Sequence, residues 1–103
     1  MIEKRSDQRI PVSIEIRFFY GKMFYSGTVS DISKKGMFIN TTECIPPNYK
    51  IVIIIPYKND LLTVNSRVSR LRQNSGCFDG MGIEILHPKN NYIEFVDALR
   101  AVT

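Results

Sequence analysis

The fold is decided by the stretch Val12-Ser-Ile-Glu-Ile-Arg-Phe-Phe-Tyr20, in which apolar side chains alternate with mostly polar ones. A period of two places successive side chains on opposite faces, so this stretch predicts a half-buried β-strand. The turn residues Gly21-Lys22 follow, and a second strand over about 24–30 completes a hairpin. The chain therefore begins as antiparallel β structure.

Four further strands are predicted over about 36–41, 49–57, 61–72 and 77–86, separated by short turn-forming segments. The run Ile51-Val-Ile-Ile-Ile55 is continuously apolar, which is typical of a strand buried on both faces. After residue 88 the period becomes helical, and a helix is predicted over about 91–102 with Asn90 or Asn91 as its cap. The predicted fold is mostly β: a six-stranded antiparallel β-barrel with a C-terminal α-helix.

This helix has one narrow polar stripe and a wide apolar face that must be covered. The face could lie over the barrel, meet another subunit to form a homodimer, or do both. Its apolar members include Tyr92, Ile93, Phe95, Val96, Leu99 and Val102.

The length of 103 residues suits one domain. Residues 1–11 are polar, end in Pro11 and show no periodicity, so we interpret them as a mobile N-terminal arm before a single domain over 12–103. No apolar run reaches the roughly 18 residues of a membrane span, and the polar start lacks a secretory signal. We therefore expect a cytoplasmic location.

Composition disfavours several classes of function. The net charge of +4 is compatible with an anionic partner, but the basic residues are not concentrated in one run, which argues against nucleic acid as the target. Cys44, Cys77 and His87 are too far apart for a recognisable metal site, and we expect no disulfide. Since neither a nucleophile–base pair nor a glycine-rich phosphate loop is evident, we expect no enzyme and no cofactor.

Arg5-Ser-Asp-Gln-Arg9 places two guanidinium groups just before the first strand, and Lys4 adds a third charge. Guanidinium can donate two parallel hydrogen bonds to a phosphate or to guanine O6 and N7. A solvated basic terminus would show the same residues. Taken alone, this motif is therefore a weak signal.

Asp31-Ile-Ser33-Lys-Lys-Gly36 is the second motif, and it is expected to form a loop. Asp31 could accept hydrogen bonds from guanine, and Ser33 could bond a phosphate oxygen or a turn amide. Gly36 would allow a positive φ and a tight backbone. An ordinary turn, however, also favours these residue types.

Arg70 and Gly82, in Val68-Ser-Arg70 and Gly80-Met-Gly82-Ile-Glu-Ile85, belong to the last two predicted strands. Glycine within a strand often marks a close backbone approach. The alternative interpretation is plain barrel construction.

Together these segments resemble the PilZ domain family, whose pattern is R-x-x-x-R, a hairpin, and then D/N-x-S-x-x-G opening the third strand. Arg5, Arg9, Asp31, Ser33 and Gly36 match it in order, and the segments around Arg70 and Gly82 resemble the family's fifth and sixth strands. The resemblance implies a cyclic di-GMP receptor without catalysis. It assigns Arg5 and Arg9 to guanine edges and phosphates, and Asp31 and Ser33 to a guanine. Lys4, just before the first arginine, could favour a stacked ligand pair.

Ligand binding would then order the arm and change the surface that an unknown downstream partner contacts. Two alternatives stay open. One is a PilZ-like domain that has lost the ligand and acts by protein contact. The other is a small barrel that binds single-stranded nucleic acid by stacking bases on Phe19, Phe24, Tyr25 and Phe38.

Overall fold

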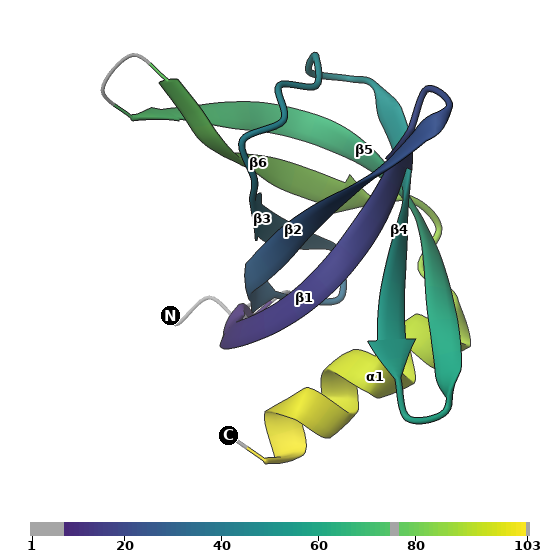
Figure 1. Cartoon of the computed structure of the whole chain (residues 1–103). Helices are drawn as coiled ribbons and strands as arrows, with labels where there is room; N and C mark the ends of the chain where they lie inside the picture. The colour runs from purple at the N-terminus through teal and green to yellow at the C-terminus, as the bar shows by residue number, and fades with distance from the viewer. Residues whose placement is uncertain (1–7, 75–76, 103) are drawn as a thin grey trace.

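The computed structural model describes residues 8–74 and 77–102, which form a closed six-stranded antiparallel barrel and one C-terminal helix (Figure 1). Neighbouring strands around the barrel follow the order β1-β2-β3-β6-β5-β4. The predicted fold class is therefore confirmed. The elements are β1 (Ile10–Tyr20), β2 (Met23–Ile32), β3 (Gly36–Asn40), β4 (Lys50–Tyr57), β5 (Asp60–Asn74), β6 (Cys77–Ile85) and α1 (Asn90–Ala101).

At two strand boundaries the structure differs from the predictions because an apolar side chain joins the core. β1 begins at Ile10, which is 4% exposed and pairs with Ile32, so the arm predicted over 1–11 is two residues too long. Residues 1–7 of that arm lie outside the described residues. β2 continues to Ile32, so Asp31 lies in a strand rather than in the predicted loop.

The barrel interior is filled by alternate side chains of every strand. In β4, Ile51, Ile53 and Ile55 are at most 3% exposed, whereas Val52 and Ile54 are only half-buried. The prediction that this strand is buried on both faces is therefore wrong. In a closed barrel one face of each strand forms the core, and the other forms the outer wall.

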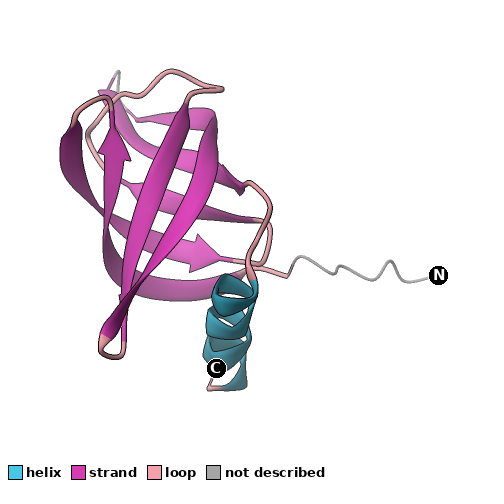
Figure 2. Cartoon of the chain, turned by 90° about the vertical axis from the view of Figure 1, so that its right-hand side faces the viewer, coloured by secondary structure: helices cyan, strands magenta, loops and turns pink. Residues whose placement is uncertain are grey.

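Helix α1 lies at one end of the barrel, as both views show (Figures 1 and 2). Tyr92, Phe95 and Val96 are buried, and the Phe95 ring meets Tyr57 edge-on at 4.8 Å. Of the arrangements left open, the structure shows the barrel covering this part of the apolar face. Val102, at the end of the helix, is 81% exposed.

The start of α1 also differs from the prediction. The N-cap residue is Lys89, in extended conformation, and it makes no side-chain capping bond. Asn90 and Asn91 are already helical, so neither is the cap. The helix begins one residue earlier than expected because the carbonyl of Lys89 accepts the first helical hydrogen bond, from the Ile93 amide at 3.0 Å.

The connection between β3 and β4 crosses the opposite end of the barrel (Figure 1). Ile45, 1% exposed, closes this end. Asn48 and Tyr49 exchange backbone hydrogen bonds with Val68 of β5 at 2.6 and 2.9 Å. No helix among the described residues is long and apolar enough to span a membrane.

Candidate ligand-binding site

The turn between β2 and β3 is organised by one buried serine. Ser33 is 0% exposed, and its Oγ accepts hydrogen bonds from the backbone amides of Lys35 and Gly36 at 3.3 and 3.1 Å. Its hydroxyl donates to the Gly36 carbonyl at 3.2 Å, and its own amide donates to the same oxygen at 2.8 Å. Of the two roles expected for this hydroxyl, the structure shows the bond to turn amides.

Gly36 is required for space rather than for an unusual backbone angle. The positive φ expected there is wrong, because among the described glycines only Gly21 has one. A Cβ at Gly36 would lie 2.6 Å from the Ile83 carbonyl of β6 and 3.3 Å from Arg9 Nη1. The missing side chain thus lets β6 and the arginine approach the turn.

Arg9 contacts both Asp31 and Ser33 of the second motif. Its Nε lies 3.0 Å from Asp31 Oδ1, and its Nη1 donates to Ser33 Oγ at 3.4 Å. The side chains of Arg9 and Asp31 are 39% and 36% exposed. Asp31 Oδ1 is buried yet has no aligned hydrogen-bond donor among the described residues, so the contact with Arg9 is electrostatic.

Only part of the first motif lies within the described residues. Arg9 lies immediately before β1, while Lys4 and Arg5 lie outside the described residues. Their predicted roles therefore stay predictions.

Arg70 and Gly82 share the outer barrel surface with Asp31. The strand registers place Asp31 opposite Phe38, Phe38 opposite Gly82, and Gly82 opposite Arg70. This row crosses four strands and therefore three strand spacings of about 4.8 Å. The Cα atoms of Asp31 and Arg70 are thus roughly 14 Å apart. A Cβ at Gly82 would lie 3.1 Å from Arg70 Nη1, so the glycine makes room for the arginine to lean toward Phe38.

Arg72 is a neighbour of this row that the sequence interpretation missed. Its guanidinium carbon lies 4.4 Å from the centre of the Phe38 ring, and Arg70 lies over the same ring at 6.0 Å. Arg72 also pairs with Asp79 at 2.8 Å and with Asn40 Oδ1 at 2.9 Å. The signal was its position two residues after Arg70, because strand residues at that spacing share a face.

The aromatic residues proposed for base stacking do not form one track. Phe19 and Phe24 pack on each other at 4.9 Å near the β1–β2 turn, and Tyr25 packs on Phe18 at 5.7 Å. Phe38 belongs to β3 and is only 5% exposed. The geometry thus gives no support to a continuous stacking surface.

The candidate site is an open surface rather than an enclosed cavity. Two clefts of about 670 and 520 Å³ lie elsewhere on the described part of the chain, and no motif residue lines either one. Within that part there is also no cluster of three or more His, Cys, Asp or Glu residues that could hold a metal ion.

Comparison with known proteins agrees with this geometry. The sequence matches the profile of the PilZ domain over residues 3–99. The chain belongs to the PilZ domain family. No curated protein matches it significantly in sequence.

Solved structures show the same PilZ fold at low identity. The PilZ domain of CeSA from a cellulose-synthesizing bacterium is 17% identical, with a TM-score of 0.72, and the match covers 90% of this chain and 98% of that one. The Bacillus subtilis inhibitor of motility, MotI/DgrA, is 12% identical, with a TM-score of 0.78 over 98% of this chain. This PilZ domain spans only 52% of the MotI/DgrA chain.

Proposed function

We propose that this PilZ domain is a receptor for cyclic di-GMP, the ligand that PilZ domains generally bind. The observation that carries the proposal is the double contact of Arg9 with Asp31 and Ser33. It joins two motifs separated by a whole hairpin into one site. The proposal assigns binding to these residues and no catalysis.

The chemistry of the residues suits a ligand with two guanines and two phosphates. Arg9, together with Arg5, would donate to the O6 and N7 atoms of a guanine or to a phosphate. The Asp31 carboxylate, whose side chain is 36% exposed, would accept from guanine N–H groups. Arg70, beside Gly82 on the same outer surface, would contact the far side of the ligand, and Lys4 would favour a stacked pair.

Ligand binding requires Arg9 to exchange partners. Half-exposed ion pairs contribute only about 0–1 kcal/mol, and guanine N–H groups would replace Arg9 as the partner of Asp31. The charge-assisted bonds gained in exchange contribute about 1.5–3 kcal/mol each. We infer that Arg5 and Arg9 close over the ligand and order the N-terminal arm before β1, which changes the surface offered to a downstream partner. If amide NMR shows equal mobility of these residues with and without ligand, this mechanism is wrong.

Calorimetric titration with cyclic di-GMP tests the function and measures how many ligands bind. Arg9→Ala should weaken binding about tenfold or more, because one charge-assisted contact is lost. Arg17→Ala is the matched control: Arg17 is an exposed arginine of β1, eight residues after Arg9 and so roughly 26 Å further along the extended chain. Unchanged affinity in Arg9→Ala, or equal losses in both variants, would remove Arg9 from the site. No binding by the unmodified protein would leave the alternative of a domain that acts by protein contact alone.

We also infer that the receptor acts in a bacterial cytoplasm, where this second messenger is made. A homodimer through α1 would have to use the residues that the barrel leaves exposed, chiefly Val102. Light scattering on the titrated samples measures the oligomeric state directly.

A further inference from the structure

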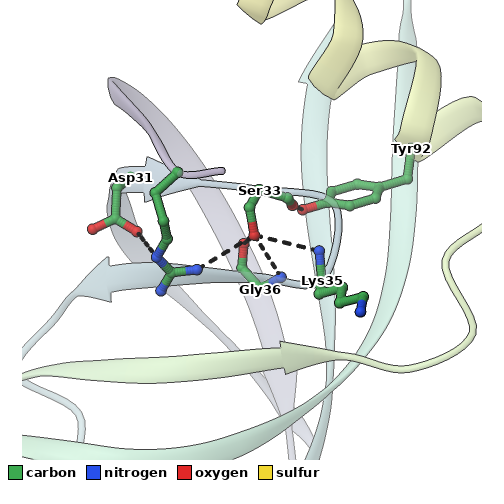
Figure 3. Close-up of polar contacts among 6 residues, drawn as sticks. Asp31, Ser33, Lys35, Gly36 and Tyr92 are labelled. Atoms are coloured by element: carbon green, nitrogen blue, oxygen red, sulfur yellow. Dashed lines mark hydrogen bonds and ion pairs between the residues drawn. The ribbon is translucent and has the colours of Figure 1, made fainter. Parts of the chain in front are cut away.

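Helix α1 makes a buried contact with the backbone of the candidate site. The Tyr92 hydroxyl donates to the Ser33 carbonyl at 2.6 Å, across 59 positions of sequence (Figure 3). Tyr92 is 1% exposed and Ser33 is 0% exposed. Removing one partner of such a buried hydrogen bond is costly, because the other polar group then stays buried without a hydrogen bond to protein or water.

The contact completes the support of the β2–β3 turn. The Ser33 amide and hydroxyl are engaged with Gly36 on the inner side of the turn. The Ser33 carbonyl is engaged with Tyr92 of α1. Without the tyrosine hydroxyl, this carbonyl would lose a donor, and the turn or the helix would have to shift.

Two weaker contacts link α1 to the same region. Lys34 Nζ lies 3.4 Å from Asp97 Oδ1, and Arg100 Nη1 donates to Gln8 Oε1 at 3.4 Å. Both are exposed, so each contributes little on its own. They show, however, that α1 touches the turn and also the residue that precedes Arg9.

We propose that Tyr92 is a positioning residue of the ligand site, which holds the Ser33 turn in the geometry that binds ligand and couples ligand occupancy to α1. This inference rests on the proposed function. Coupling is reciprocal: if docked α1 strengthens ligand binding, bound ligand strengthens the docking of α1 by the same factor.

The test compares three variants of the full chain by calorimetry with cyclic di-GMP and by amide hydrogen exchange. Tyr92→Phe removes only the hydroxyl. Tyr57→Phe is the matched control, because it removes a hydroxyl from a ring that also packs on α1 but belongs to β4. Phe95→Leu removes the ring that packs on Tyr57 and so loosens the docking of α1, while the Tyr92 hydroxyl is kept.

Tyr92→Phe should weaken ligand binding about three- to tenfold, the range that one buried hydrogen bond supports. Tyr57→Phe and Phe95→Leu should stay within about twofold of the unmodified protein, because α1 is still docked in most molecules of both variants and keeps the Tyr92 hydroxyl. Phe95→Leu lowers only the melting temperature. Saturating ligand should slow amide exchange in α1 of the unmodified protein by a comparable factor, and this protection should be lost in Tyr92→Phe.

Equal binding by Tyr92→Phe and the unmodified protein would overturn the inference and leave the receptor proposal intact. An equal loss in Phe95→Leu would overturn it too, since general loosening of α1 would then explain both. If the unmodified protein does not bind, the receptor proposal fails, but exchange without ligand still decides the role of Tyr92. The amides of Lys35 and Gly36 must then exchange faster in Tyr92→Phe than in Tyr57→Phe.

Discussion

At the scale of single residues, the side chains that two glycines lack are as important to the site as its polar groups. Gly36 and Gly82 create room for Arg9 and Arg70, and Ser33 uses its hydroxyl to hold the turn. The arginines are therefore placed by neighbours that need not touch a ligand. Substitutions at these neighbours should affect binding through geometry.

Gly36→Ala tests this directly. Its Cβ would meet the β6 backbone at 2.6 Å, and a backbone atom cannot rotate away, so the turn must shift. We expect a loss of about 1–3 kcal/mol in the free energy of unfolding, measured in urea, together with weaker cyclic di-GMP binding. Gly21→Ala is the control: it is strained by a φ of +66° but meets no atom within 4 Å. If Gly21→Ala weakens binding as much as Gly36→Ala does, lost stability rather than site geometry is the cause.

At the scale of elements, the pattern of apolar residues along the chain was sufficient to predict six strands and one helix. The spacing of buried side chains is a local property of the sequence. This local pattern does not predict irregularities in strand pairing. The register shifts between Val29 and Asp31 and between Val68 and Arg70 set which way the site residues point, and they arise from pairing with strands distant in sequence. Arg9, Asp31, Ser33 and Gly36 were named from the sequence as candidate site residues, whereas the contacts of Arg72 and Tyr92 involve residues distant in sequence.

Helix α1 should contribute to stability through its barrel-facing residues only. Phe95 is 3% exposed and packs on Tyr57, so Phe95→Ala should cost about 3–5 kcal/mol of unfolding free energy. Val102→Ala, at an 81% exposed position, should stay within about 0.5 kcal/mol. Urea denaturation measures both. A large loss in Val102→Ala that depends on protein concentration would instead indicate that a second copy covers the end of the helix.

For the whole molecule, the two ends of the barrel are different. The β3–β4 connection closes one end with Ile45, and α1 covers the other, where it contacts the Ser33 turn. The candidate site is thus built where sheet and helix meet. A ligand bound there is expected to stabilise the fold as a unit, because it contacts the barrel and strengthens the docking of the helix.

This stabilisation is measurable as a shift of the melting temperature. A ligand at one hundred times its Kd adds about 2.7 kcal/mol to the stability of a protein that binds it only when folded. For a domain of this size, that corresponds to a rise of about 10–20 °C in scanning calorimetry. In Arg9→Ala, with affinity about tenfold weaker, the same ligand concentration should give about half the stabilisation, near 1.4 kcal/mol. GMP at that concentration should cause little shift, because one guanine and one phosphate occupy only part of a site that extends from Asp31 toward Arg70. Equal shifts with GMP and cyclic di-GMP would show that the outer row beyond Asp31 takes no part in binding.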